Sequence, residues 1–269
     1  MDYVISEWLN LLLRWLHVVV GVFWIGQTAL FAWLDHRMSV AERQGSPQVW
    51  MVHSGGFYRV QKQAVQAPLP PVIHWFQWEA ALTWVSGFSL LVVVYYLGGA
   101  MFVPDGIGTG TGIALSVGLL GVGWLIYDGI WRSALAPHEG LAGALCLALV
   151  VAFAWALTQV FTGRGAYLEV GAMIGTVMAA NVWIRILPPQ RRMIAAAAAG
   201  EPVDATWSQG AKLRSKHNTF LALPLILIML SNHFPVTTYG HRYNWLMLGL
   251  FLVAGIGARR LLNWHERRR

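Results

Sequence analysis

Repeated apolar runs near 20 residues long are the feature that most constrains this chain. Runs of that length are typical of helices that cross the hydrocarbon core of a bilayer. The overall content agrees, with 57% hydrophobic and 12% charged residues and a mean hydropathy of +0.52. The sequence predicts an all-α, polytopic helical membrane bundle of about seven transmembrane helices, a single domain over 1–269. The predicted spans are 6–34, 74–97, 112–132, 140–162, 167–187, 217–233 and 243–264.

Basic residues concentrate in alternate connections between these spans. They are Arg37, Arg43, Arg59 and Lys62, then Arg132, then Arg191, Arg192, Lys212, Arg214 and Lys216, then Arg259, Arg260 and Arg267 to Arg269. The positive-inside rule therefore predicts a periplasmic N-terminus and a cytoplasmic C-terminus, with inner loops at 35–73 and 188–215. We expect a short helix near Ala41–Val52 in the first loop and a short surface helix over RRMIAAAAAG (191–200) in the second. The net charge of +7 then reflects membrane orientation, and we expect no nucleic-acid partner.

Cysteine usage excludes several classes of site. Cys146 is the only cysteine in the sequence, so no disulfide can form within the chain. The sequence has no CxxCH motif for covalent c-type haem and no thiolate cluster for a metal.

The first predicted span carries a polar face. His17, Gly21, Trp24 and Thr28 are spaced by four, three and four residues, which places them on one side of a helix. Neutral imidazole is a common axial ligand of haem iron, and the glycine leaves room for a flat ring. A histidine that is only hydrogen-bonded within the packing explains the pattern equally well.

The second predicted span opens with His74 and carries Glu79, Thr83 and Ser86 on one face. A carboxylate inside a membrane is costly unless it is paired or functional. Arg185 or Arg59 is a possible partner for Glu79, so a purely structural ion pair is the alternative to a catalytic role.

Three other places offer groups for a planar anion. Asn181 and Arg185 lie one turn apart, although Arg185 could also reach toward lipid headgroups. Segment 52–60, VHSGGFYRV, combines His53 and Arg59 with two glycines, and an ordinary turn is the alternative there. His217 and Asn218 open the sixth predicted span.

The predicted orientation sorts these residues by side of the membrane. His17, His233 and His241 fall in the outer half. The inner half holds His36, His53, Arg59, His74, Glu79, His138, Asn181, Arg185, His217 and Asn218. We expect a ligand site inside and a redox centre nearer the outside, with haem b held by His17 and His233. His74 with His217 is a second possible pair.

Several segments in order resemble one known family. They are LRWLHVVVGVFWIG (13–26), HSGGFYRVQK (53–62), HWFQWEAALTWVSGF (74–88), NVWIRILPPQ (181–190) and SKHNTFLALPLILIMLSNHFP (215–235). Together they are similar to the membrane portion of the bacterial cytochrome c-linked urate hydroxylases, and the similarity extends over nearly the whole chain. This resemblance implies a multi-pass protein of the bacterial inner membrane that oxidises urate to 5-hydroxyisourate.

The resemblance also implies roles for the candidate residues. Urate or a similar planar anion would bind through His53, Arg59, Asn181, Arg185, His217 and Asn218, and Glu79 or His74 would accept a proton. Members of that family pass electrons to a C-terminal cytochrome c domain. This chain stops after the seventh predicted span, so we expect a separate c-type cytochrome as acceptor.

Two other functions remain open at this stage. One is a non-enzymatic or haem-bearing accessory subunit of a larger respiratory or photosynthetic complex. The other follows from the first span, where His17, Trp24 and Gly26 are also similar to helical protoporphyrinogen oxidases and copper-resistance D proteins. That similarity implies porphyrin oxidation or copper handling.

Overall fold

The computed structural model describes residues 3–268 except 46–47, 64, 66–67 and 104–105. Its helices are α1 (Tyr3–Arg43), α2 (Trp78–Leu90), α3 (Thr109–Ile130), α4 (Glu139–Thr158), α5 (Gly163–Ala180), α6 (Leu187–Ala198), α7 (Ala205–Leu230) and α8 (Asn244–Arg268). Two π-helical segments, η1 (Leu91–Leu97) and η2 (Asn181–Ile186), continue α2 and α5, and the 3₁₀ turn η3 (Ser231–His233) follows α7. The prediction of an all-α helical bundle is confirmed.

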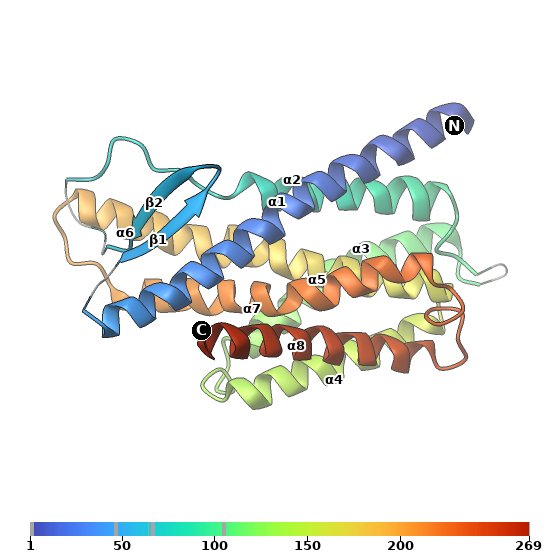
Figure 1. The fold of residues 1–269 in the computed structure, drawn as a ribbon. Helices are drawn as coiled ribbons and strands as arrows, with labels where there is room; N and C mark the ends of the chain where they lie inside the picture. Colours follow the sequence, from blue (N-terminus) through green and yellow to red (C-terminus); the bar gives the residue numbers. More distant parts are fainter. Residues whose placement is uncertain (1–2, 46–47, 64, 66–67, 104–105, 269) are drawn as a thin grey trace.

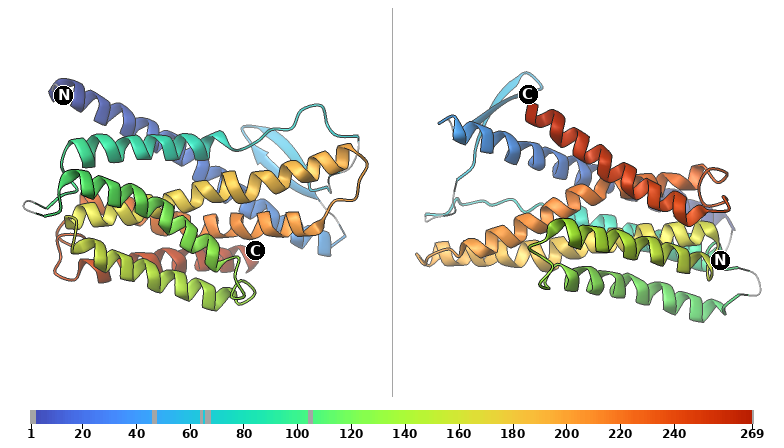
Figure 2. Two further views of the ribbon diagram at one scale, coloured as in Figure 1. Left: turned by 180° about the vertical axis from the view of Figure 1, so that it is seen from behind. Right: turned by 90° about the horizontal axis from the view of Figure 1, so that it is seen from below.

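The bundle has two distinct ends (Figure 1). One, the hairpin end, carries a two-stranded sheet, α6 and the end of α8. The opposite, N-terminal end carries the start of α1 and the connections that follow η1, α4 and α7. α5 and α7 run through the middle, with α1 and α2 on one side and α4 and α8 on the other (Figures 1 and 2). Successive long helices therefore run back and forth between these two ends, as the predicted spans require.

Six helices in the described part of the chain are long and apolar enough to span a bilayer. They are Tyr3–Arg43, Trp78–Leu97, Thr109–Ile130, Glu139–Thr158, Gly163–Ala198 and Asn244–His265. The protein is therefore a multi-pass membrane protein. The remaining predicted span, 217–233, is the apolar part of α7 together with η3, and α7 begins well before it with a polar half.

Segment 188–215 is helical over most of its length, beyond the short helix that the sequence predicts at 191–200. The helix that starts at Gly163 passes through η2 into α6 without a break, despite Pro188 and Pro189. Both prolines lie in the first turn of α6, directly after the π-helical segment η2, where the regular α-helical hydrogen-bond ladder is already interrupted. After a short connection, Asp204 caps α7 by accepting a 2.8 Å hydrogen bond from the backbone N–H of Thr206.

The sheet is a β-hairpin that an all-α prediction did not anticipate. Strands β1 (Gln48–His53) and β2 (Gly56–Gln61) pair antiparallel, with His53 opposite Gly56. Ser54 and Gly55 form the two-residue loop with φ of 49° and 76°. Positive φ at both positions is typical of the tight turn that matches strand twist. An ordinary turn therefore explains the two glycines of this segment. The short helix expected near Ala41–Val52 is wrong beyond Arg43, where α1 ends.

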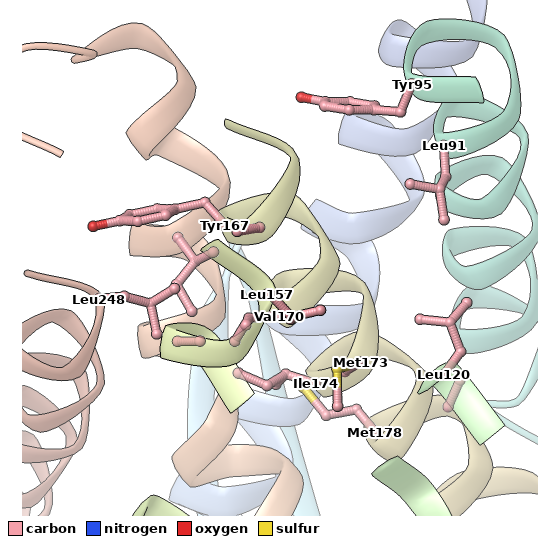
Figure 3. Packing of buried hydrophobic residues seen from close by; sticks show 14 of the residues in the cluster. Leu91, Tyr95, Leu120, Leu157, Tyr167, Val170, Met173, Ile174, Met178 and Leu248 are labelled. Atoms are coloured by element: carbon pink, nitrogen blue, oxygen red, sulfur yellow. The ribbon is translucent and has the colours of Figure 1, made fainter. Parts of the chain in front are cut away.

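The core lies where α5 meets its neighbours (Figure 3). Tyr167, Val170, Ile174 and Met178 are buried on α5, together with Leu120, Leu157 and Leu248 from other helices. α5 is the most buried span, whereas the outer helices expose many large apolar side chains. Apolar faces on the outside are what a lipid environment requires.

Helices α7 and α8 pack in close backbone contact. A Cβ atom at Gly255 of α8 would collide with the backbone of Pro224 in α7. Glycine at this position therefore lets the two helices approach where Pro224 interrupts the hydrogen-bond ladder of α7.

Candidate functional site

Four of the six predicted substrate-binding residues belong to one polar network near the hairpin end. Asn181 donates hydrogen bonds of 3.0 Å to Oδ1 of Asn218 and to the hydroxyl of Tyr127. That hydroxyl lies 2.7 Å from Nδ1 of His217. Asn218 in turn donates to the carbonyl oxygen of Met178, at 2.9 Å. Helices α3, α5 and α7 are therefore joined by amide, phenol and imidazole groups.

The fourth residue, Arg185, joins this network through Asp128. Its Nε and Nη2 atoms both donate to the Asp128 carboxylate, with the Nε contact at 2.8 Å. Arg214 donates to the same carboxylate at 2.7 Å, and the exposed Arg132 lies 3.8 Å away. Asp128 and Arg132 lie one helical turn apart, and their contact is only the outermost part of a larger cluster. Arg185 is engaged with a carboxylate rather than extended toward headgroups.

The cluster carries an excess of positive charge. Asp128 and Arg214 are almost fully buried, with side chains 5% and 6% exposed, while Arg185 is 28% exposed. One carboxylate thus faces two close guanidinium groups in a poorly solvated place. A buried charge without compensation is unfavourable, so the cluster would be stabilised by one further anion.

Three buried polar atoms in the network have no hydrogen-bond partner among the described residues. They are Oδ1 of Asn181, Nη1 of Arg214 and Nε2 of His217. All three belong to side chains around Tyr127, since Arg214 stacks over the Tyr127 ring at 5.0 Å. Unpaired buried polar groups are uncommon in native proteins and need an explanation such as a missing ligand or water. Here they offer an acceptor, a cationic donor and an imidazole nitrogen.

A cavity of about 890 Å³ adjoins this network. Tyr127, His217 and Trp131 line it near the hairpin end, and the Trp131 ring lies 4.0 Å from the His217 ring. Lys216 and Glu139, which form an ion pair with each other, also line it. The rest of the lining is mostly apolar and comes from α3, α4, α5, α7 and α8. The cavity is large enough for a small planar molecule. Of the three side chains with unpaired atoms, His217 lines it, whereas Asn181 and Arg214 lie behind Tyr127 and do not.

Neither predicted catalytic residue is part of this network. Glu79 lies in the first turn of α2, where Oε1 accepts a 3.0 Å hydrogen bond from Gln27 of α1 and Oε2 is buried without a partner. Its partner is thus Gln27 rather than Arg185 or Arg59. His74 is exposed before α2 and packs against Phe76. Trp78, the residue before Glu79, contacts Trp183 of η2, so the start of α2 lies next to the network.

His53 and Arg59 also lie apart from the network. Both are exposed on the hairpin, which packs against α1, and Arg59 stacks over Trp50 at 5.9 Å. They belong to the same end of the molecule, but no described contact joins them to Asn181, Arg185, His217 or Asn218.

His17 has the chemistry of an axial haem ligand. Its Nδ1 lies 3.0 Å from the carbonyl oxygen of Thr83, which can only accept, so Nδ1 carries the proton. Nε2 therefore keeps its lone pair, and it has no hydrogen bond among the described residues. A hydrogen bond from Nδ1 to a backbone carbonyl is the usual support of a metal-binding histidine. The ring also lies directly against Gly87, where a Cβ atom would be 2.9 Å from Cε1.

The proposed second haem ligand is less well placed. His233 ends η3 at the N-terminal end of the bundle and is exposed. No contact between His17 and His233 occurs in the described structure, nor any group of three metal-binding side chains. His17 fits a haem on chemical grounds, whereas its pairing with His233 stays a prediction. In the other predicted pair, His217 contacts Tyr127 and Trp131 and His74 contacts Phe76, so no described contact joins these two histidines.

Sequence reasoning missed Tyr127 and Arg214. Arg214 was assigned to a loop, yet it shares a helical face with His217 and Asn218, three and four residues further along α7. Extending the helical periodicity backwards from His217 would have found it. Tyr127 precedes Asp128 in an apolar span, and no sequence pattern marks it.

A family comparison matches almost the whole chain. The model of the urate oxidase N-terminal family matches residues 3–269, and so includes every element of the network. No curated protein and no solved structure matches the chain. With the match extending over almost all of its length, the chain belongs to the urate oxidase N-terminal family.

Proposed function

We propose that this membrane protein oxidises urate at the network around Tyr127. The observation that carries the proposal is the set of three unpaired buried atoms beside a cluster with excess positive charge. Urate is a planar anion whose ring edge alternates N–H donors and carbonyl acceptors. Arg214 would bind a carbonyl or the charge, Asn181 would accept from a ring N–H, and His217 would contact the edge between them.

The reaction has a defined balance of protons and electrons. Urate and one water molecule give 5-hydroxyisourate, two protons and two electrons. A base must therefore take a proton as the electrons leave, which typically contributes about 10²–10⁴ in rate. His217 is suited to this role because Tyr127 can either donate to or accept from Nδ1, which lets Nε2 act in either tautomer. Glu79, with its unpaired Oε2, is the second candidate base.

Arg185 acts indirectly in this proposal. Because its Nε and Nη2 atoms both donate to Asp128, it neutralises that carboxylate and leaves the charge of Arg214 available to the substrate. His53, Arg59 and His74 are exposed and would act where substrate approaches from the hairpin end.

Electrons must leave toward the other end of the bundle. Haem b bound at Nε2 of His17 is the proposed carrier, and a separate c-type cytochrome is the proposed acceptor. When bound, haem supplies one-electron steps between the two-electron oxidation of urate and the cytochrome. The hydrogen bond from His17 to Thr83 would fix the ring orientation and keep Nε2 unprotonated. The corresponding location is the bacterial inner membrane, with the hairpin end in the cytoplasm.

The test is urate-driven reduction of added cytochrome c by the purified full-length protein in detergent or liposomes. The wild-type protein should reduce cytochrome c only when urate is present, and His217→Gln should lose most of that rate. Glu79→Gln tests the second candidate base in the same assay. Absence of urate-dependent reduction by the wild-type protein would contradict the proposal and would favour the accessory-subunit function.

Binding can be tested separately from turnover with Arg214→Gln. This change removes the excess charge but leaves Asp128 paired with Arg185, so the fold should persist. Saturating urate should raise the unfolding temperature of the wild-type protein. At a urate concentration of 100 times its Kd, the free energy of unfolding should increase by about 2.7 kcal/mol. Arg214→Gln should lose this urate-dependent shift. An equal shift in both proteins would exclude Arg214 from the substrate site.

A further inference from the structure

A second buried acid lies far from the proposed substrate site. Glu169 is in α5, two turns from its start at the N-terminal end of the bundle, and is 0% exposed. No described residue forms an ion pair with it, and its Oε1 has no hydrogen-bond partner. Asp128, which is also buried, differs because two guanidinium groups surround it. An ionised carboxylate at the position of Glu169 would be strongly disfavoured.

Two hydroxyl groups connect Glu169 to η1. The Ser116 hydroxyl lies 2.5 Å from Oε2 of Glu169, and the Tyr96 hydroxyl lies 2.7 Å from Oγ of Ser116. Each hydroxyl can donate or accept, so a proton can move along this chain of hydrogen bonds in either direction. Protons can run from Tyr96 through Ser116 to the carboxyl group, or from the carboxyl group through Ser116 to Tyr96.

Tyr96, the far end of this hydrogen-bonded chain, lies near the N-terminal end of the bundle. Tyr96 is the residue before Leu97, where η1 ends, and it is 7% exposed. The π-helical turn buries Tyr95 and Tyr96 together although they are consecutive. Such turns occur frequently at functional sites. Here η1 delivers a phenol to an interior acid from a position close to the surface of the bundle.

The charged groups near this chain are already engaged. Arg164, five residues before Glu169 on α5, donates to Asn232 at 3.0 Å and stacks over Tyr95. From η1 the titratable groups are Tyr95, which donates to Asn232, and Tyr96. α3 contributes Ser116. No titratable side chain of α2, α4 or α7 forms a described hydrogen bond or ion pair with Glu169. Apart from the Ser116 hydroxyl, no described group there would stabilise a carboxylate.

We propose that Glu169 is an intramembrane proton-binding site, served by Ser116 and Tyr96 as a hydrogen-bonded path to the N-terminal end of the bundle. At neutral pH the carboxyl group holds its proton. On release, the proton passes from Oε2 to Oγ of Ser116, the Ser116 hydrogen passes to the Tyr96 oxygen, and the Tyr96 hydrogen passes to solvent. One proton leaves and no bond to carbon changes. The site is independent of urate oxidation.

Infrared spectroscopy of the purified full-length protein at neutral pH tests this site. The wild-type protein should show a carbonyl band of a protonated carboxylic acid that shifts in deuterium oxide and is lost in Glu169→Gln. Glu201→Gln, which changes an exposed acid, should keep the band. A spectrum unaltered by Glu169→Gln would mean that Glu169 is ionised and would overturn the proposal.

The path has its own test. Tyr96→Phe and Ser116→Ala keep the acid, so the band should persist while its shift in deuterium oxide becomes slower. If exchange is as fast as in the wild-type protein, the path through Tyr96 is wrong. Should Glu169→Gln fail to fold, a hydrophobic carbodiimide, which reacts with protonated carboxyl groups, replaces it on the wild-type protein. Mass spectrometry should find Glu169 modified and Asp128 unmodified, and the reverse would overturn the proposal.

Discussion

The hydroxyl oxygen of Tyr127 lies 2.7 Å from Nδ1 of His217, and it links an imidazole on α7 to the amide of Asn181 on η2. We predict that Tyr127→Phe keeps the fold but lowers urate-driven cytochrome c reduction by roughly tenfold. The hydroxyl orients His217 rather than taking the proton itself, so the loss should be smaller than the roughly 10²–10⁴ expected for removal of a general base. Steady-state rates of purified Tyr127→Phe and His217→Gln measure the two losses.

Tyr243→Phe is the matched control for this prediction. It also removes a phenolic hydroxyl, but Tyr243 is exposed at the start of α8, at the other end of the bundle. Its rate should equal that of the wild-type protein. Equal rates for Tyr127→Phe and Tyr243→Phe would exclude Tyr127 from the site.

Asp128 and Asp35 allow a comparison of buried and exposed clusters. Asp128 is hydrogen-bonded by Arg185 and Arg214, with the exposed Arg132 farther away, and Asp35 contacts Lys62 and Lys212. Asp128→Asn should lower the stability to unfolding by about 3–5 kcal/mol, because two buried guanidinium groups lose their counter-charge. Asp35→Asn should cost at most about 1 kcal/mol, because its lysines are exposed.

Thermal unfolding of both variants in the same detergent measures this difference. The Asp128→Asn protein should also gain stability from added salt or a bound anion more than the wild-type protein does. Similar unfolding temperatures for the two variants would show that the cluster at Asp128 is solvated, and would weaken it as an anion site.

Apolar periodicity was sufficient to predict the helices and their order, because each lipid-facing segment must satisfy its own backbone hydrogen bonds. It was not sufficient at the hairpin, and at 188–215 it indicated a short helix but not that this helix continues from α5. There the outcome depends on where prolines lie within a helical turn and on two residues with positive φ. Sequence patterns describe one segment at a time, and these features depend on neighbouring turns.

The candidate site was predicted in part for a related reason. Asn181, Arg185, His217 and Asn218 were found because polar side chains are rare inside spans. Their partners Tyr127 and Arg214 come from other helices, and only the packing of α3, η2 and α7 brings them together. Gln27 beside Glu79, and the acid Glu169 with its hydroxyl groups, depend in the same way on contacts between segments far apart in the chain.

The orientation in the membrane can be tested with cysteine labelling. In a Cys146→Ser background, Phe57→Cys introduces a thiol on the hairpin and Val236→Cys introduces one at the opposite end. The two native side chains are similarly accessible, at 79% and 82% exposed. The positive-inside rule predicts that an impermeant maleimide labels Val236→Cys in intact cells and Phe57→Cys only after permeabilisation. The reverse pattern would place the proposed urate site in the periplasm.

Gly87 and His17 provide a test of the haem proposal that does not require turnover. A Cβ atom at Gly87 would lie 2.9 Å from Cε1 of His17, so Gly87→Ala must displace the imidazole or separate α1 from α2. Overpacking of this kind typically costs about 1–3 kcal/mol. Gly26→Ala, on the same α1–α2 pair of helices, adds a methyl group where nothing lies within 4 Å and should be tolerated.

The readout is the reduced-minus-oxidised absorption spectrum of each purified protein. A b-type haem signal in the wild-type protein should be lost in His17→Ala, reduced in Gly87→Ala and unchanged in Gly26→Ala. His233→Ala separates the two possibilities for the second ligand: loss of the signal would require η3 to move toward His17 when haem binds, because His233 is exposed in the structure. A haem signal that persists in His17→Ala would exclude His17 as a haem ligand. The hydrogen bond from His17 to Thr83 would then serve only to join α1 to α2.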